Sequence, residues 1–174
     1  MNSPGNTEHG ASPGRGSLEE NMAFLRRQPV FADIPLEMLR LYAYLSQRER
    51  FQKDEPIIRQ GEPGDRMYLI MTGTVAVCEK YNGRECLLQT LAADGFNSFG
   101  ELALLAEFDW FYSARAVTDV TLLSITREAF RKVLEQYSEQ YSEAVADIVR
   151  WRIRRFVDQT HALLDQSAQE NLNP

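Results

Sequence analysis

The 174-residue chain contains few of the residues that build covalent, metal or membrane structures. It has two cysteines, and its two histidines, His9 and His161, lie far from them in the sequence, so the spacing does not indicate a metal site. No apolar run approaches the roughly 18–20 residues of a membrane span. The first residues also lack the apolar core of a secretory signal peptide. We therefore expect a cytoplasmic protein with no metal and no membrane segment.

The two cysteines are not placed to form a disulfide. Cys78 and Cys86 flank Asn82-Gly83, a pair that predicts a two-residue hairpin turn. In that register Cys78 faces Leu87 and Cys86 faces Glu79, so the thiols lie on opposite faces of the hairpin. We interpret both as buried structural thiols.

The sequence lacks the motifs of common enzyme and nucleic-acid-binding classes. There is no glycine-rich P-loop, no histidine–cysteine nucleophile pairing and no metal-ligand spacing. The net charge of -6 disfavours nucleic acid unless basic residues gather in one patch. The arginines of the basic cluster at 150–155, RWRIRR, would spread over several faces of a helix and can pair with acidic neighbours. We therefore interpret the cluster as a solvated helix surface and not as a nucleic-acid site. We predict a non-catalytic protein.

The chain divides into segments that differ in composition and in hydrophobic periodicity. Residues 1–17 are rich in Gly, Pro, Ser and Asn and predict a disordered leader. Helical periodicity marks 18–47 and 127–165, including a long helix over 142–165, and the polar residues 166–174 predict a frayed tail. Between them, residues 49–126 alternate short apolar runs with turn sequences, which predicts a β-sandwich or jelly-roll barrel. The expected strands are 56–58, 67–71, 74–81, 86–91, 112–117 and 120–125.

The segment Phe99–Arg115, FGELALLAEFDWFYSAR, identifies a family. Gly100 opens a short amphipathic turn whose N-terminal amides suit an anion. FGELALL resembles the phosphate-binding cassette of the cyclic-nucleotide-binding domain family, which includes the catabolite activator protein and protein kinase A regulatory subunits. GEPGDRMYLIMTGTVAV at 61–77 is similar to a second signature of that family. The resemblance covers roughly residues 28–157. It implies a mainly β fold: a double-stranded β-helix (jelly-roll) barrel with N-terminal helices and a long C-terminal helix, over residues 18–165.

The resemblance also implies how the cassette would bind a ligand. In relatives that bind cyclic nucleotide, the glutamate at the position of Glu101 accepts a hydrogen bond from the ribose 2′-hydroxyl. Neighbouring amides meet the phosphate, and an arginine nine residues after the glutamate neutralises it. That position is Trp110 in this sequence. Arg115 lies at an odd offset from it along an extended strand and should point to the opposite sheet face, while Arg66 and Arg84 could reach the site only from loops.

Losing one partner of a buried charge pair costs on the order of 2–5 kcal/mol, or roughly thirtyfold to several-thousandfold in affinity. Glu107 and Asp109 would further disfavour an anion. The aromatic side chains here could fill the cavity or stack on a flat ligand without a phosphate. The predicted pocket residues are Phe99, Gly100, Glu101, Leu102, Ala103, Trp110, Phe111 and Tyr112.

These residues predict a non-catalytic regulatory or sensor module in which binding of cyclic AMP or cyclic GMP is weakened or lost. No cofactor is expected beyond a weakly bound cyclic nucleotide or nucleoside-like ligand. One alternative is a functional sensor that holds the phosphate with backbone amides, and another is a protein-interaction or dimerisation module. A regulator of the catabolite activator type needs a helix-turn-helix domain after the long helix. Because the printed sequence stops at Pro174, nucleic-acid binding is not expected.

An apolar stripe on the C-terminal helix suggests a homodimer. The other interpretation is that the stripe packs on the barrel, and the sequence alone does not separate the two. The stripe comprises Val145, Val149, Ile153, Phe156 and Leu163.

Overall fold

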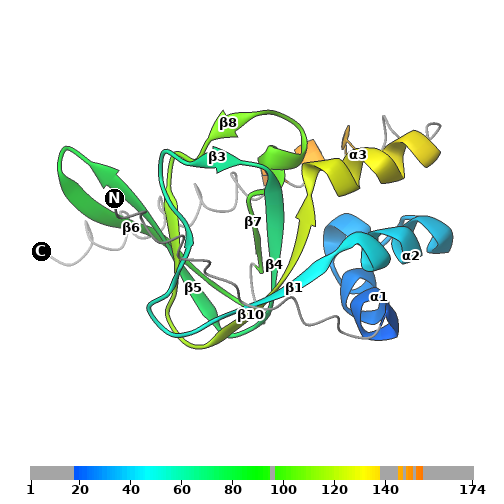
Figure 1. Ribbon diagram of the computed structural model, residues 1–174, viewed down its shortest axis with the longest axis horizontal. Coiled ribbons are helices and arrows are strands. Elements are labelled where there is room, and N and C mark those ends of the chain that lie inside the picture. Colours follow the sequence, from blue (N-terminus) through cyan, green and yellow to red (C-terminus); the bar gives the residue numbers. More distant parts are fainter. Residues whose placement is uncertain (1–17, 95–96, 138–144, 147, 151, 155–174) are drawn as a thin grey trace, which may run out of the picture.

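The computed structural model describes residues 18–94, 97–137, 145–146, 148–150 and 152–154. Figure 1 shows a barrel of antiparallel strands with helices gathered at one end. The mainly β fold with flanking helices is therefore confirmed. The helical elements are α1 (Leu18–Arg26), η1 (Pro29–Phe31), α2 (Leu36–Leu45), η2 (Glu101–Leu104) and α3 (Arg127–Gln136). The strands are β1 (Gln47–Phe51), β2 (Pro56–Ile58), β3 (Pro63–Gly64), β4 (Arg66–Thr72), β5 (Thr74–Tyr81), β6 (Arg84–Ala92), β7 (Ser98–Phe99), β8 (Phe108–Asp109), β9 (Ser113–Ala116) and β10 (Val120–Thr126).

Apart from β5 and β6, which form a hairpin, strands that follow one another in sequence lie in different sheets, as in a jelly roll. One sheet has the order β1-β10-β4-β7, another has β2-β9-β5-β6, and β3 pairs with β8. The chain passes from β4 to β5 at Gly73, whose φ is +86°. A Cβ there would lie 2.3 Å from the carbonyl oxygen of Asp119, so this corner requires glycine.

The β5–β6 hairpin has the register that the sequence predicted. Cys78 pairs with Leu87 and Glu79 pairs with Cys86. Both turn residues have positive φ, 49° at Asn82 and 77° at Gly83, as a primed turn requires. Cys78 and Cys86 are free thiols, as expected from their opposite faces. The expectation that both are buried is wrong for Cys86, because β6 is an edge strand and its first half faces solvent.

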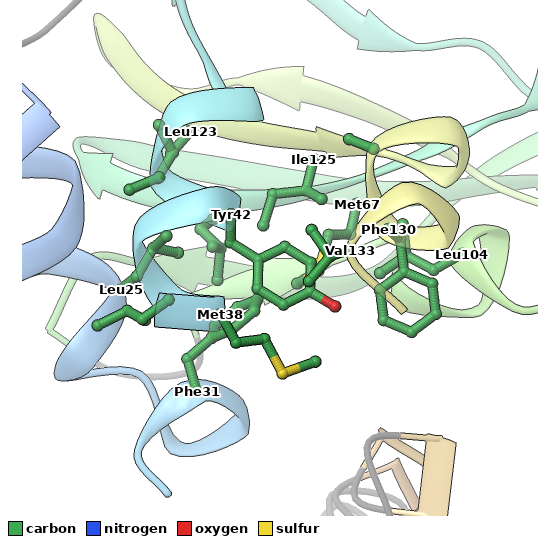
Figure 2. Close-up of a cluster of buried hydrophobic side chains, with 14 of the residues drawn as sticks. Leu25, Phe31, Met38, Tyr42, Met67, Leu104, Leu123, Ile125, Phe130 and Val133 are labelled. Atoms are coloured by element: carbon green, nitrogen blue, oxygen red, sulfur yellow. The ribbon is translucent and has the colours of Figure 1, made fainter. Parts of the chain in front are cut away.

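Two apolar cores stabilise the fold. One fills the interior of the barrel and includes Ile70, Val75, Leu122 and Trp110. The other lies between the barrel and the helices. Figure 2 shows side chains of α1, η1 and α2 meeting those of β4, β10 and α3 in this second core, with the ring of Tyr42 near its centre. The cassette joins the two cores, since Ala103 belongs to the first and Leu104 to the second.

Some element bounds differ from the sequence prediction. The second helix ends at Leu45 instead of Gln47, because residues 47–51 pair with β10 as strand β1. Strands β3, β7 and β8 were not predicted, and each has only two residues. The long C-terminal helix was predicted over 142–165. Its residues 145–146, 148–150 and 152–154 are helical, and its other residues lie outside the described part of the chain.

No helix among the described residues is long and apolar enough to cross a membrane. Within the same residues, no group of three or more His, Cys, Asp or Glu side chains is placed to hold a metal ion.

Candidate functional site

The site is built around Gly100, where β7 ends and the cassette turn begins. Its φ is +82°, and it is followed directly by η2, a short 3-10 helix of about one turn. A Cβ at this position would lie 2.8 Å from the carbonyl oxygen of Arg66 and 3.0 Å from Cη2 of Trp110. Both the backbone angle and the lack of space therefore require glycine here. The predicted short helix is present, but as a 3-10 turn.

Trp110 is held against this glycine by the small β3–β8 ladder. Its amide donates to the carbonyl of Glu62 at 2.8 Å, and its carbonyl accepts from the amide of Gly61 at 2.7 Å. The side chain is 6% exposed. Its six-membered ring also lies against Gly64, where a Cβ would meet Cε2 at 3.1 Å. The indole is thus packed onto the backbone where the cassette starts.

The aromatic residues around Trp110 pack mainly on one another. Phe108 meets its ring edge-on at a centroid distance of 5.3 Å, and Tyr112 lies 5.6 Å away. Tyr112 and Phe99 are buried in the same barrel core. Phe111 is 49% exposed. Of the two possibilities left open by the sequence, this packing favours aromatic side chains that fill the barrel themselves.

Glu101 is a buried carboxylate with a partner that the sequence did not predict. It is 3% exposed. Its Oε1 lies 3.1 Å from Nη1 of Arg152, a residue of the helical segment 145–154. The arginines at 150–155 were expected to spread over several helix faces and to be able to pair with acidic neighbours, and Arg152 makes such a pair. Helical periodicity alone could not show that this segment lies beside the cassette.

The other arginines considered from the sequence lie elsewhere. Arg115 is exposed and pairs with Asp54 at 3.7 Å, while Ala114 and Ala116 beside it are buried, as the odd offset predicted. Arg66 pairs with Asp65 at 2.8 Å and with Glu49 at 3.5 Å. Arg84 lies at the exposed tip of the β5–β6 hairpin.

The Asp65–Arg66 pair shifts the ionisation of both groups. The hydrogen bond from Arg66 lowers the pKa of Asp65, assisted by the nearby positive charges and opposed by partial burial. The same bond raises the pKa of Arg66. Arg66 is therefore fixed as the partner of a carboxylate and is not available as a free cation for the cassette.

Arg127 is a structural residue of the site that sequence reasoning missed. Its guanidinium donates to the carbonyl oxygens of Ala103 at 2.6 Å, Ala106 at 2.9 Å and Gly64. It also pairs with Glu107 at 3.3 Å. Arg127 thereby ties the far end of the cassette to β3 and to the start of α3. The only sequence signal was its place directly after a strand, and that is not specific.

The remaining predicted residues are divided between core and surface. Ala103 is fully buried and Leu102 is half-buried. On the predicted dimer helix, Val145 is half-buried, whereas Val149 and Ile153 are exposed. Phe156 and Leu163 lie outside the described residues. Among the described residues of this segment, Ile148 is buried and packs into the helical core.

Comparison with known protein families gives one match that includes the cassette. The cyclic nucleotide-binding domain profile matches residues 48–137, which run from β1 through α3.

Relatives of known role share part of their length with this chain. The CRP-like cAMP-activated global transcriptional regulator of Mycobacterium tuberculosis is 31% identical over 106 residues, covering 60% of this chain and 46% of the regulator. The human potassium/sodium hyperpolarization-activated cyclic nucleotide-gated channel 4 is 37% identical over 114 residues, covering 66% of this chain and 8% of the channel. The chain therefore spans less than half the length of either relative.

Solved structures give the same fold. The N-terminal domain of a transcriptional regulator from Streptomyces coelicolor superposes with a TM-score of 0.66 at 26% identity, covering 78% of this chain and 95% of that domain. The catabolite activator protein of Thermus thermophilus has a TM-score of 0.63 at 29% identity, covering 79% of this chain and 63% of that protein.

Proposed function

The chain belongs to the cyclic nucleotide-binding domain family, and we propose that it is a non-catalytic regulatory module of that family in which binding of cyclic AMP and cyclic GMP is weakened or lost. The relatives named above are transcription regulators and a channel, which supports a regulatory role. The observation that carries the proposal is the burial of Trp110 against Gly100, at the sequence position where nucleotide-binding relatives have an arginine.

The packing of Trp110 argues against a phosphate in two ways. The indole supplies no positive charge, and it covers the backbone at the start of the cassette turn, where the cyclic phosphate of a relative would approach. To admit a ligand there, the ring would have to leave a buried position between Gly64, Phe108 and Tyr112. Removing a buried tryptophan from its packing costs about 3–5 kcal/mol, which a ligand would have to offset.

The charges around the cassette support the same conclusion. Among the residues that the structure describes, Arg127 is bonded to backbone carbonyls and Arg152 to Glu101. A cyclic nucleotide would therefore have to break one of these contacts to gain a cationic partner. The exposed carboxylate of Asp109 has the same sign of charge as an incoming anion, whereas that of Glu107 is paired with Arg127.

The test is calorimetric titration of the wild type and of Trp110→Arg with cyclic AMP, cyclic GMP and adenosine. We expect the wild type to bind cyclic nucleotide too weakly to be measured. Trp110→Arg should bind it with a Kd at least thirtyfold below the detection limit of the wild-type titration, because an arginine restores the phosphate partner. Phe111→Arg is the matched control, since it adds the same charge at the adjacent exposed position. Phe111→Arg should not bind cyclic nucleotide more tightly than the wild type does.

Two outcomes would count against this account of the pocket. Micromolar binding of a cyclic nucleotide by the wild type, with no gain in Trp110→Arg, would favour the alternative of a functional sensor that holds the phosphate with backbone amides. Equal gains in Trp110→Arg and Phe111→Arg would show that position 110 has no special relation to the ligand.

We also propose that the module acts in the cytoplasm as a homodimer or on a protein partner. Val149 and Ile153 are exposed apolar side chains on one helical segment, and their contact with a second copy would cover them. Light scattering should then give a dimer for the wild type and a monomer for Val149→Glu/Ile153→Glu. Val117→Glu, at an exposed valine on the barrel, is the control and should stay dimeric. A wild type that is monomeric at high concentration contradicts the dimer.

A further inference from the structure

The outer edge of strand β6 is open to solvent. Among the described residues β6 is the last strand of its sheet and pairs only with β5. Residues 84–88, which form its first half, are exposed. Figure 1 shows the β5–β6 hairpin projecting from the barrel on the side away from α1, α2 and α3. An open strand edge of this kind can accept a further strand through main-chain hydrogen bonds.

The hydrogen bonds of Lys80 show which backbone groups of β6 point outwards. The amide of Lys80 donates to Oε1 of Gln60 at 2.8 Å, and its carbonyl accepts from Nε2 of Gln60 at 3.4 Å. Both groups therefore point away from β6. Glu85 lies directly opposite Lys80 in the ladder, so its own amide and carbonyl point away from β5. Leu87, two residues further along, has the same orientation. No described residue outside the ladder forms a hydrogen bond with the backbone of Glu85 or Leu87.

The two edges of the hairpin differ in how they are protected. On the β5 edge, the side chain of Gln60 bonds to Lys80 where a neighbouring strand would bond. Strand β6 contains neither proline nor lysine, the residues with which natural edge strands oppose further pairing. Its register with β5 is regular from Arg84 to Leu87 and shifts only after Leu87. The accessible edge is therefore the segment 84–87.

The side chains of this edge indicate which strand would fit. Glu85 and Leu87 lie on the same face of β6, and Leu87 is 63% exposed. If a second copy paired through the same groups, the residue opposite Glu85 would be Glu85 or Leu87 of that copy, and neither is cationic. A strand with Lys or Arg at that position would form an opposite-charge pair across the ladder. The net charge of -6 also favours the approach of a basic segment.

We propose that the edge of β6 at 84–87 binds an extended, basic segment of a protein partner as an added antiparallel strand. The segment has Lys or Arg opposite Glu85 and an apolar residue opposite Leu87, and its backbone bonds to the outward amides and carbonyls of these two residues. This inference rests on the proposed function, in which the module can act on a protein partner, and it names the surface and the chemistry of that contact.

The first experiment titrates the full-length, 15N-labelled protein with short peptides to millimolar concentration. The probe is TVTVTKT with acetylated and amidated ends, in which the second valine would lie opposite Leu87 and the lysine opposite Glu85. We expect saturable shifts of the amide signals of Glu85 and Leu87, and weaker binding of TVTVTET. N-methylation of that valine and of the lysine should abolish binding, because their amides would face β6. N-methylation of the threonine between them, whose amide would point away, should not.

Variants of the protein test the same contact from the other side. Glu85→Lys should prefer TVTVTET, and the ratio of the two affinities should change by roughly twofold to thirtyfold relative to the wild type. Glu37→Lys is the matched control, since it makes the same change of charge at an exposed position on α2, and it should keep the wild-type preference. Leu87→Pro removes an outward amide, which an edge strand tolerates. It should bind TVTVTKT roughly fivefold more weakly than Leu87→Ala, which keeps that amide.

Several results would overturn the proposal. These are the lack of a saturable response, shifts confined to residues outside 84–88, equal binding of the two N-methylated peptides, or an unchanged preference in Glu85→Lys. Shifts of the β6 amides that depend on protein concentration without peptide, and that disappear in Leu87→Pro, would instead place a second copy at this edge and also overturn it. Wild-type binding of cyclic AMP would contradict the proposed loss of nucleotide binding and leave the peptide result unaffected.

Discussion

The substitution Gly100→Ala tests the geometry on which the site depends. The φ of Gly100 is +82°, a left-handed conformation that costs roughly 1–2 kcal/mol for a residue with a side chain. The new methyl group would also lie 2.8 Å from the carbonyl oxygen of Arg66 and 3.0 Å from the ring of Trp110. The carbonyl belongs to β4, a central strand of its sheet, so it has little freedom to move away.

The expected loss is the sum of backbone strain and crowding. Overpacking a filled site costs about 1–3 kcal/mol, so Gly100→Ala should lose about 2–5 kcal/mol in its free energy of unfolding. For a chain of this length, each kcal/mol lowers the melting temperature by roughly 2–4 °C. Chemical denaturation with constant slope gives the free energy directly, and the melting temperature provides an independent check.

Gly61→Ala separates the two contributions. Its φ is +86°, nearly that of Gly100, but a Cβ there would meet nothing within 4 Å. It should therefore lose only the roughly 1–2 kcal/mol of backbone strain. The difference between the two variants measures the crowding by β4 and Trp110. If Gly100→Ala is no less stable than Gly61→Ala, Trp110 does not lie against the cassette, and the structural basis of the proposed loss of nucleotide binding is refuted.

Two further predictions concern groups beside the cassette. Arg127→Ala should lose about 3 kcal/mol or more of unfolding free energy, since hydrogen bonds from a charged group contribute roughly 1.5–3 kcal/mol each. The control is Arg131→Ala, at an exposed position on the same helix, and it should change the unfolding free energy little. Equal losses in the two variants would refute the role of Arg127. The pKa of Asp65 is lower in the folded protein, so its stabilising contribution is present at neutral pH and is lost as the pH falls through that depressed value. The difference in unfolding free energy between wild type and Asp65→Asn should therefore shrink below about pH 4, and a difference that is constant with pH would contradict it.

The parts of the fold that the sequence predicted well are those determined by local patterns. Strand β5 has the predicted bounds, Thr74–Tyr81, because alternating apolar residues are bounded by Gly73 on one side and Asn82-Gly83 on the other. The hairpin register follows from the turn type, and it placed Cys78 opposite Leu87 correctly. The exposure of Cys86 did not follow, because it depends on β6 being an edge strand.

The elements that the sequence did not predict form through pairing between distant segments. Strand β1 reads QRERF and has no apolar alternation, but it pairs with β10 along its whole length. Strands β3 and β8 have two residues each, too few for any periodicity. In each of these two ladders, the paired strands are far apart in the sequence, and hydrophobic periodicity within one segment does not show which other segment it pairs with.

The residues of the candidate site also fall into those that a local motif predicts and those that only the fold brings together. Gly100, Glu101 and Trp110 could be placed because they share one motif of fixed spacing. Arg127 and Arg152 lie 26 and 51 residues after Glu101 and reach the cassette only through the packing of two helical segments. The two arginines act on different groups, since Arg127 bonds to carbonyls at the far end of the cassette and Arg152 neutralises the carboxylate at its start. Among the described residues, both of these arginines are bonded to oxygen atoms of the protein, Trp110 supplies no charge, and Oε2 of Glu101 is a buried acceptor without a hydrogen-bond partner. We therefore expect this site to favour a hydrogen-bond donor over an anion.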